Sequence, residues 1–195
     1  MPLWPGPHNI LSLTDSKTHY HDNVHVTRIE MGLHTGTHID FPYHHISEGK
    51  KSHEFSVDYF KGRALVLHCF DKNPITFNSN HLDSILSQEI PDFLLLRTQI
   101  KPNTSSVFNS IFPVLDPSTS NLLTTKGIRI LGIDSPSVDL PGEEPTNHKI
   151  LLGNNILLLE GLVLTSVPQG LYELNCFPLA IDGVESSPCR AILLN

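Results

Sequence analysis

Four side chains of the kind that bind zinc-class metals lie close together in residues 34–44, which read HTGTHIDFPYH. They are His34, His38, Asp40 and His44. Imidazole nitrogens and carboxylate oxygens are the ligands that zinc and related ions take in proteins. The cluster therefore indicates a candidate metalloenzyme. The alternative is a polar loop with unrelated histidines, because the chain contains 12 of them.

The spacing of these residues predicts a bend in the chain. On a helix, Asp40 would point away from the face that His34 and His38 share. On a straight strand all would share one face, but four residues of strand cover roughly 13 Å. That separation is too large for both imidazoles to reach one ion at about 2 Å. We expect the bend at Gly36, because glycine accepts backbone angles that other residues avoid. His38 and Asp40 should then lie on one side of the extended part that follows.

His148 and Glu160 are candidates for a second half of the site. Glu160 closes the apolar run at residues 156–159, and charged groups are rarely buried unless they are paired or bound to metal. The alternative is a glutamate at a strand end in solvent. Together with the first group, the two residues give enough ligands for two ions, because carboxylates can bridge metals about 3.5–4 Å apart.

Length and composition are those of an ordinary globular protein. We expect one domain, residues 1–195, with 39% hydrophobic and 17% charged residues. The formal net charge of −7 disfavours nucleic acid and anionic membranes as partners, since both call for basic surfaces. No apolar run approaches the roughly twenty residues of a membrane span, and no signal peptide is visible. Cys69, Cys176 and Cys189 are interpreted as reduced thiols of a cytoplasmic protein.

Short apolar runs alternate with a few helical patterns along the chain. The runs whose length suits strands are residues 24–33, 63–70, 93–96, 128–133, 156–159, 171–179 and 191–194. Helical patterns that begin near capping residues cover residues 57–60, 82–89 and 118–126. Because each helical pattern is followed by an apolar strand, we expect an α/β fold with parallel or mixed pairing. Residues 134–147, rich in proline, serine and acidic side chains, are expected to form a long loop.

Residues 34–44 resemble the signature of the metal-dependent cyclase family, His-x-Gly-Thr-His-x-Asp-x-Pro-x-His. That family includes bacterial kynurenine formamidase and the isatin hydrolases. Three further blocks are similar to the family and follow in its order, at residues 132–139, 148–162 and 187–191. The resemblance therefore covers nearly the whole chain.

The resemblance implies a metal-binding role for five residues. His34, His38 and Asp40 would bind one ion. Asp40 and Glu160 would bridge to a second ion, which His148 also binds. Two divalent cations are therefore expected as cofactors, with zinc as the first choice and manganese as the alternative.

The resemblance also implies a catalytic residue, a substrate contact and a fold. His44 would be the proton donor and acceptor, and Trp4 would pack on an aromatic substrate. The expected fold is a single α/β domain of the swivelling β/β/α type with a mixed sheet, assembled as a homodimer or larger oligomer. His45 follows His44 directly and should point away from the site if the chain is extended there.

The resemblance also implies a function, the hydrolysis of a C–N amide bond, for which the two ions would activate a water. An aryl formamide such as N-formylkynurenine is the leading small-molecule substrate. Opening of a cyclic amide, as in isatin hydrolase, uses the same ligands and stays an alternative. A non-catalytic metal-binding protein on the same fold is a third hypothesis. His44 argues against that third hypothesis, because a purely structural site is closed and needs no proton-transfer group.

Overall fold

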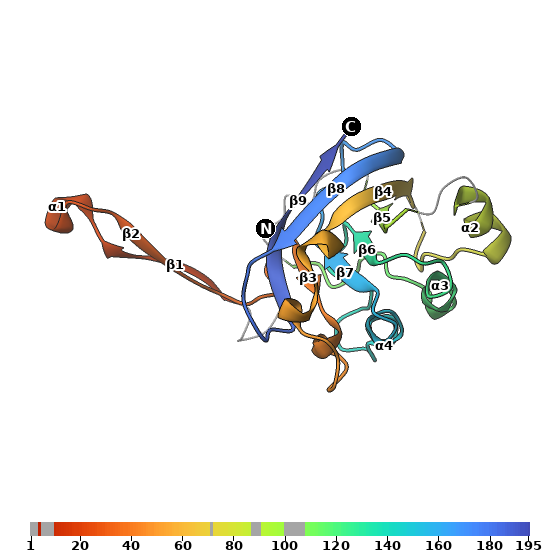
Figure 1. The fold of residues 1–195 in the computed structure, drawn as a ribbon, viewed down its shortest axis with the longest axis horizontal. Helices are drawn as coiled ribbons and strands as arrows, with labels where there is room; N and C mark the ends of the chain where they lie inside the picture. The colour runs from red at the N-terminus through yellow and green to blue at the C-terminus, as the bar shows by residue number, and fades with distance from the viewer. Residues whose placement is uncertain (1–3, 5–9, 71, 87–90, 100–107) are drawn as a thin grey trace.

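The computed structural model describes Trp4 and residues 10–70, 72–86, 91–99 and 108–195 (Figure 1). The strands are β1 (Leu11–Lys17), β2 (Val26–Met31), β3 (His38–Asp40), β4 (Lys61–His68), β5 (Phe93–Arg97), β6 (Ile130–Ile133), β7 (Leu157–Glu160), β8 (Gly170–Pro178) and β9 (Ser186–Leu194). The helices are α1 (His19–Asp22), α2 (Ser79–Leu86), α3 (Pro117–Leu123) and α4 (Thr146–Gly153), with 3-10 helices η1 (Pro42–His44), η2 (Ser52–Glu54) and η3 (Val57–Phe60). Each run predicted as a strand overlaps an observed strand.

Seven strands close a barrel in the order β3-β7-β6-β5-β4-β8-β9. The strands β4, β5, β6 and β7 run parallel to one another. The strands β8, β9 and β3 run antiparallel to their neighbours. The barrel therefore has a parallel half and an antiparallel half, and the predicted α/β fold with mixed pairing is confirmed.

The parallel half is apolar on both faces because both faces are covered. In β5, Phe93 and Leu95 point into the barrel core, whereas Leu94 and Leu96 pack in a second cluster outside it. Helices α2, α3 and α4 lie over this outer face (Figure 1). They contribute the buried side chains Leu82, Leu86, Leu123, Leu151 and Leu152.

The same alternation places polar side chains outside the barrel core. Ile39 of β3 and Leu159 of β7 belong to the core cluster, so His38, Asp40 and Glu160 fall on the outer face of their strands. The two strands are paired, with His38 opposite Glu160. Polar groups from distant parts of the sequence therefore meet on the outer face of this strand pair.

Strands β1 and β2 form an antiparallel hairpin that extends away from the barrel, with α1 at its tip (Figure 1). Every residue of β1 is exposed. The sequence predicted a strand at residues 24–33 but not its partner β1. We refer to residues 11–31 below as the arm.

The helices agree with the sequence patterns in part. Residues 57–60 form η3, and α2 ends at Leu86, while the end of the predicted pattern at residues 87–89 lies outside the described residues. α3 begins with Asp116 as its N-cap, whose side chain accepts a hydrogen bond from the Ser118 amide at 2.9 Å. No helix in the described part of the chain has the length and apolar composition needed to cross a membrane.

α4 was not predicted, and its first residue shortens the expected loop at residues 134–147. The residue before the helix is Pro145, which offers no side-chain cap. The helix is held by burial of Leu151 and Leu152 instead. α4 carries His148 in its first turn. The sequence patterns therefore missed this helix, but His148 was named as a candidate site residue.

Candidate metal centre

The turn at Gly36 brings His34 back toward His38, as predicted. Gly36 has a φ of 77°, a left-handed conformation that glycine adopts at little cost. Its carbonyl oxygen lies 2.8 Å from Nδ1 of His38. The ring centroids of His34 and His38 are 5.1 Å apart. With Nδ1 engaged by the turn, Nε2 is the nitrogen that His38 offers to the site.

α4 and β7 bring two more side chains to the outer face of β3. Nε2 of His148 lies 3.8 Å from Oδ2 of Asp40 and 3.5 Å from Oε1 of Glu160. Nε2 of His38 lies 3.7 Å from Oε2 of Glu160. The potential ligands form two groups, His34–His38–Asp40 and Asp40–His148–Glu160, and the ligand atoms of each group lie within 4.8 Å of one another. Asp40 belongs to both groups.

Buried polar atoms without partners mark the centre of this cluster. Nε2 of His38 and both carboxylate oxygens of Asp40 have no hydrogen-bond partner among the described residues. Nδ1 of His34 lies 2.9 Å from Asp40 Oδ1, but not in the alignment of a hydrogen bond. Each unsatisfied buried polar atom costs roughly 1–3 kcal/mol. Imidazoles and carboxylates gathered in this way fit divalent cations, which would satisfy these atoms.

The buried acids and imidazoles shift one another's pKa values. Burial lowers the pKa of His34, but the charge and close contact of Asp40, together with Glu185 and Glu160, outweigh burial and raise it to about 10. Burial raises the pKa of Glu160 to about 7, with His148 opposing the shift and Asp40 adding to it. Burial also acts to raise the pKa of Asp40, but the charges of His38 and His34 hold it below its usual range.

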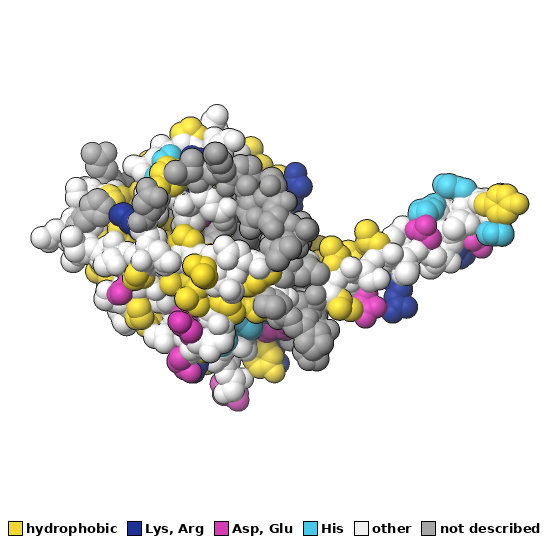
Figure 2. Space-filling model, turned by 180° about the vertical axis from the view of Figure 1, so that it is seen from behind, with side chains coloured by type: hydrophobic (Ala, Val, Ile, Leu, Met, Phe, Trp, Pro, Cys, Tyr) yellow, Lys and Arg dark blue, Asp and Glu magenta, His cyan; other side chains and the backbone are white. Residues whose placement is uncertain are grey.

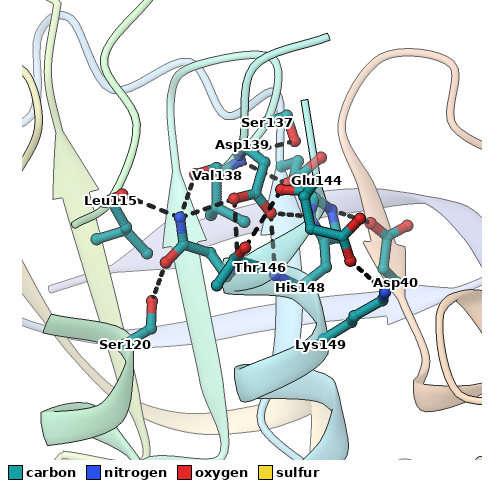
Figure 3. A network of polar contacts seen from close by, with 12 residues as sticks. Asp40, Leu115, Ser120, Ser137, Val138, Asp139, Glu144, Thr146, His148 and Lys149 are labelled. Atoms are coloured by element: carbon teal, nitrogen blue, oxygen red, sulfur yellow. Dashed lines mark hydrogen bonds and ion pairs between the residues drawn. The ribbon is translucent and has the colours of Figure 1, made fainter. Parts of the chain in front are cut away.

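Asp139 fixes the orientation of His148 (Figure 3). Its Oδ2 lies 2.7 Å from Nδ1 of His148. The backbone amides of Asn147 and His148 donate to the same carboxylate at 3.1 and 3.0 Å. Since a carboxylate only accepts, Nδ1 carries the proton and the lone pair of Nε2 faces Asp40 and Glu160. Asp139 was not among the predicted site residues, although it ends the family-like block at residues 132–139.

His44 and His45 both face the site. The ring centroid of His44 lies 4.3 Å from that of His34, and the centroid of His45 lies 4.7 Å from that of His148. The expectation that His45 points away was wrong, because residues 42–44 form a 3-10 helix and not an extended chain. Burial lowers the pKa of His44 to about 3, and burial with the nearby His148 lowers that of His45 to about 4. Both rings are therefore neutral at pH 7.

A cavity of about 360 Å³ opens onto both ligand groups. His44, His45 and an apolar set of side chains line it; that set is Trp4, Pro136, Leu140, Pro141 and Pro145. The Trp4 ring packs edge-on against Phe108, with centroids 5.1 Å apart. A neighbouring cavity of about 330 Å³ shares Trp4, His34 and His38. The volume of the first cavity is in the range that holds a small ligand.

Comparison with known sequences gives full-length relatives. Residues 1–140 match the sequence model of the Cyclase family. The kynurenine formamidases of Bacillus cereus (strain ZK / E33L) and Bacillus thuringiensis (strain Al Hakam) are each 34% identical over 198 residues. Each alignment covers 97% of this chain and 90% of the relative.

Comparison with solved structures gives the same fold. A structure described as a predicted metal-dependent hydrolase from Bacillus stearothermophilus has a TM-score of 0.80 and 28% identity, covering 99% of this chain and 91% of that chain. Isatin hydrolase A from Labrenzia aggregata has a TM-score of 0.79 and covers 99% of this chain and 88% of its own. At 21% identity, the likeness to isatin hydrolase A concerns the fold alone.

Proposed function

The chain belongs to the cyclase family, and from this membership we propose that it is a metal-dependent hydrolase that cleaves a C–N amide bond. The substrate that we propose is an aryl formamide such as N-formylkynurenine, with formate and an arylamine as products. Full-length similarity to kynurenine formamidases supports the substrate class. The observation that carries the proposal is the pair of ligand groups that share Asp40 and line one cavity with Trp4.

The proposed cofactors are two divalent ions, zinc in preference to manganese. His34, His38 and Asp40 would hold one ion, and Asp40, His148 and Glu160 would hold the other. Three imidazoles and two carboxylates make a donor set typical of zinc. When bound, such ions supply a water-derived nucleophile at neutral pH and polarise the amide carbonyl.

The chain's own residues bind the substrate and move the proton. His44 is neutral at pH 7, so a ring nitrogen can accept a proton from the attacking water and donate it to the leaving nitrogen. Trp4 lines the cavity, and its ring would pack on the aryl group. The apolar side chains Leu140 and Pro141 exclude water from the bound substrate. Asp139 keeps the proton of His148 on Nδ1.

We also propose the finer description of the fold and assembly. Helices α2, α3 and α4 cover the parallel half of the barrel, and the other half is antiparallel. This arrangement supports a single domain at residues 1–195 with a fold of the swivelling β/β/α type. The exposed arm supports a homodimer or larger oligomer, because a two-stranded hairpin on its own is marginally stable.

Metal analysis of two variants tests the proposed site. His38→Ala and Glu160→Ala remove one ligand from each group, so the purified variants should contain less metal than the wild-type protein. His53→Ala is the control, since His53 is exposed and belongs to neither ligand group. Unchanged metal content in both ligand variants would remove the proposed site.

Two assays test the proposed reaction. His44→Ala should keep its metal and hydrolyse N-formylkynurenine about 10²–10⁴-fold more slowly, the usual contribution of a general acid and base. Full activity of His44→Ala would exclude its role. The metal-loaded wild-type protein should turn over N-formylkynurenine in preference to isatin. Turnover of isatin alone, or of neither compound, would contradict the proposed substrate.

A further inference from the structure

His45 completes a cluster of imidazoles that the ligand groups above do not include. Its ring centroid lies 4.1 Å from that of His44 and 4.7 Å from that of His148. The centroids of His44 and His148 are 5.8 Å apart. One ligand nitrogen from each of the three rings lies within 4.8 Å of the other two. All three side chains line the same cavity.

The nitrogens of this cluster are available for a cation. Nδ1 of His148 is engaged by Asp139, so Nε2 is the atom that His148 can offer. Within the described part of the chain, no hydrogen bond occupies a ring nitrogen of His44 or His45. His44 ends the helix η1 and His45 is its C-cap, whose amide donates to the Pro42 carbonyl at 3.2 Å, so the turn of this helix holds both rings at the cavity. Three imidazoles held in this way can each present one lone pair.

His148 links this cluster to the group that contains Asp40 and Glu160, and it can serve only one of them at a time. A neutral imidazole whose Nδ1 carries a proton has a single lone pair, at Nε2. An ion bound by His44, His45 and His148 is therefore an alternative to an ion bound by Asp40, His148 and Glu160. The two arrangements differ in chemistry: one offers three imidazoles, and the other offers one imidazole and two carboxylates.

We propose that His44, His45 and His148 form an alternative cation site, the imidazole site, which competes for His148 with the carboxylate site of Asp40, His148 and Glu160. Imidazole ligands suit nickel, copper and zinc, whereas carboxylates suit manganese and magnesium. The imidazole site would therefore select nickel-like ions, and the carboxylate site would retain manganese. Filling the imidazole site takes up His44, so it inhibits any reaction that needs His44 for proton transfer; this consequence alone depends on the proposed function.

Calorimetric titration of the metal-free full-length protein, with Ni²⁺ and separately with Mn²⁺, tests this proposal. In His45→Phe we expect Ni²⁺ affinity to fall at least about tenfold and Mn²⁺ affinity to stay within about twofold. Phenylalanine keeps the ring but offers no nitrogen, so packing is largely preserved. His53→Phe is the matched control, since it changes an exposed histidine outside the cavity, and it should leave both affinities unchanged.

The outcomes separate this proposal from the proposed function. Equal Ni²⁺ affinity in wild type and His45→Phe overturns the imidazole site. An equal loss for both ions also overturns it, because His45 would then support the carboxylate site. These readings do not depend on catalysis. If the Mn²⁺-loaded protein hydrolyses an amide, added Ni²⁺ should inhibit it, and His45→Phe should require at least about tenfold more Ni²⁺ for the same inhibition.

Discussion

At the scale of single side chains, protons and cations compete for the same lone pairs in the candidate metal centre. The pKa of His34 is raised to about 10 and that of Glu160 to about 7. The pKa of His148 is also raised, because hydrogen bonding to Asp139 and the charge of Glu160 outweigh burial. At pH 7 His34 therefore holds a proton, and Glu160 holds one in about half of the molecules, so a cation must displace these protons. Metal binding should therefore release protons.

The sign of the pH dependence follows from these raised pKa values. Because the ligands must be deprotonated, affinity should fall as the pH falls, by about tenfold per pH unit for each proton released. Calorimetry at pH 7 in buffers of different ionisation enthalpy counts the protons. Titrations on either side of pH 7 give the slope. A metal affinity that does not change with pH would contradict the idea that protons and cations bind the same side chains.

Asp139 should act on the metal through His148. In Asp139→Asn, an NH₂ group replaces one carboxylate oxygen. The single oxygen that remains cannot accept hydrogen bonds from the Asn147 amide, the His148 amide and Nδ1 of His148 together. We expect the affinity for the ion at His148 to fall about 10–100-fold. Nitrogen NMR of the His148 ring should also show the proton leaving Nδ1 in part of the molecules.

Asp134→Asn is the matched control for Asp139→Asn. Asp134 is also buried, and it accepts from the amides of Thr98 and Gln99 at 2.8 and 3.1 Å, but it does not contact His148. Loss of stability in both variants with unchanged metal affinity would leave Asp139 only the role of accepting backbone amides at the start of α4.

At the scale of elements, two turns hold the halves of the site together. The hydroxyl of Thr37 donates to the Gly161 carbonyl, just after β7, at 2.7 Å. Gly161 has a φ of 64°, and a Cβ there would lie 2.6 Å from the Gly36 carbonyl oxygen. Gly161→Ala should therefore push the turns apart, lowering the free energy of unfolding by about 2–4 kcal/mol through backbone strain and the clash. The metal affinity should fall as well, because a shift of the turn at Gly36 would move His34 away from the other ligands.

Gly127→Ala separates the clash from backbone strain alone. Gly127 has a φ of 73°, and a Cβ there would meet no atom within 4 Å. This variant should lose only about 1–2 kcal/mol, the cost of the left-handed conformation, and keep its metal affinity. Urea unfolding and metal titration of both variants measure the difference. Equal losses would show that the approach of the two turns does not position the site.

Local sequence patterns predicted the strands and helices that bury an apolar face. They also predicted the bend at Gly36, because the side chains of His34 and His38 are too short to reach one ion from a straight strand. The run containing β5 is apolar throughout because both faces are covered, and such a run is visible in the sequence. The turn at Gly36 was predictable because His34 and His38 could not otherwise bind one ion. The meeting of Asp40 with Glu160 came from the family-like blocks and not from the local pattern.

The position of His45 could not be predicted because distant contacts determine η1. The amide of Phe41 donates to the Glu185 carbonyl at 2.9 Å, and the amide of Tyr43 donates to the Lys50 carbonyl at 3.0 Å. The role of Asp139 could not be predicted either, because its contact with His148 exists only once α4 has packed. Neither residue has a local signal that distinguishes it from an ordinary polar residue.

At the scale of the whole molecule, the arm is the feature that the barrel does not account for. Figure 2 shows hydrophobic side chains along its base and histidines near its tip. Leu11 pairs with Met31 and Leu13 with Ile29, so the four side chains share one face of the hairpin. Leu13 and Ile29 are 65% and 57% exposed. An isolated hairpin with an exposed apolar face gains stability by packing on another chain.

We therefore expect the arm to contact a second copy of this chain. Light scattering coupled to size exclusion should give a dimer or larger species, and the double variant Leu13→Ser/Ile29→Ser should shift it toward the monomer mass of 21.7 kDa. Thr14→Ser/Arg28→Lys changes the neighbouring pair on the opposite face and serves as the control. A wild-type mass of one chain would contradict the oligomer, whereas an oligomer that survives the double variant would place the contact elsewhere. Metal content should be the same in all three proteins, because no described arm residue belongs to a ligand group.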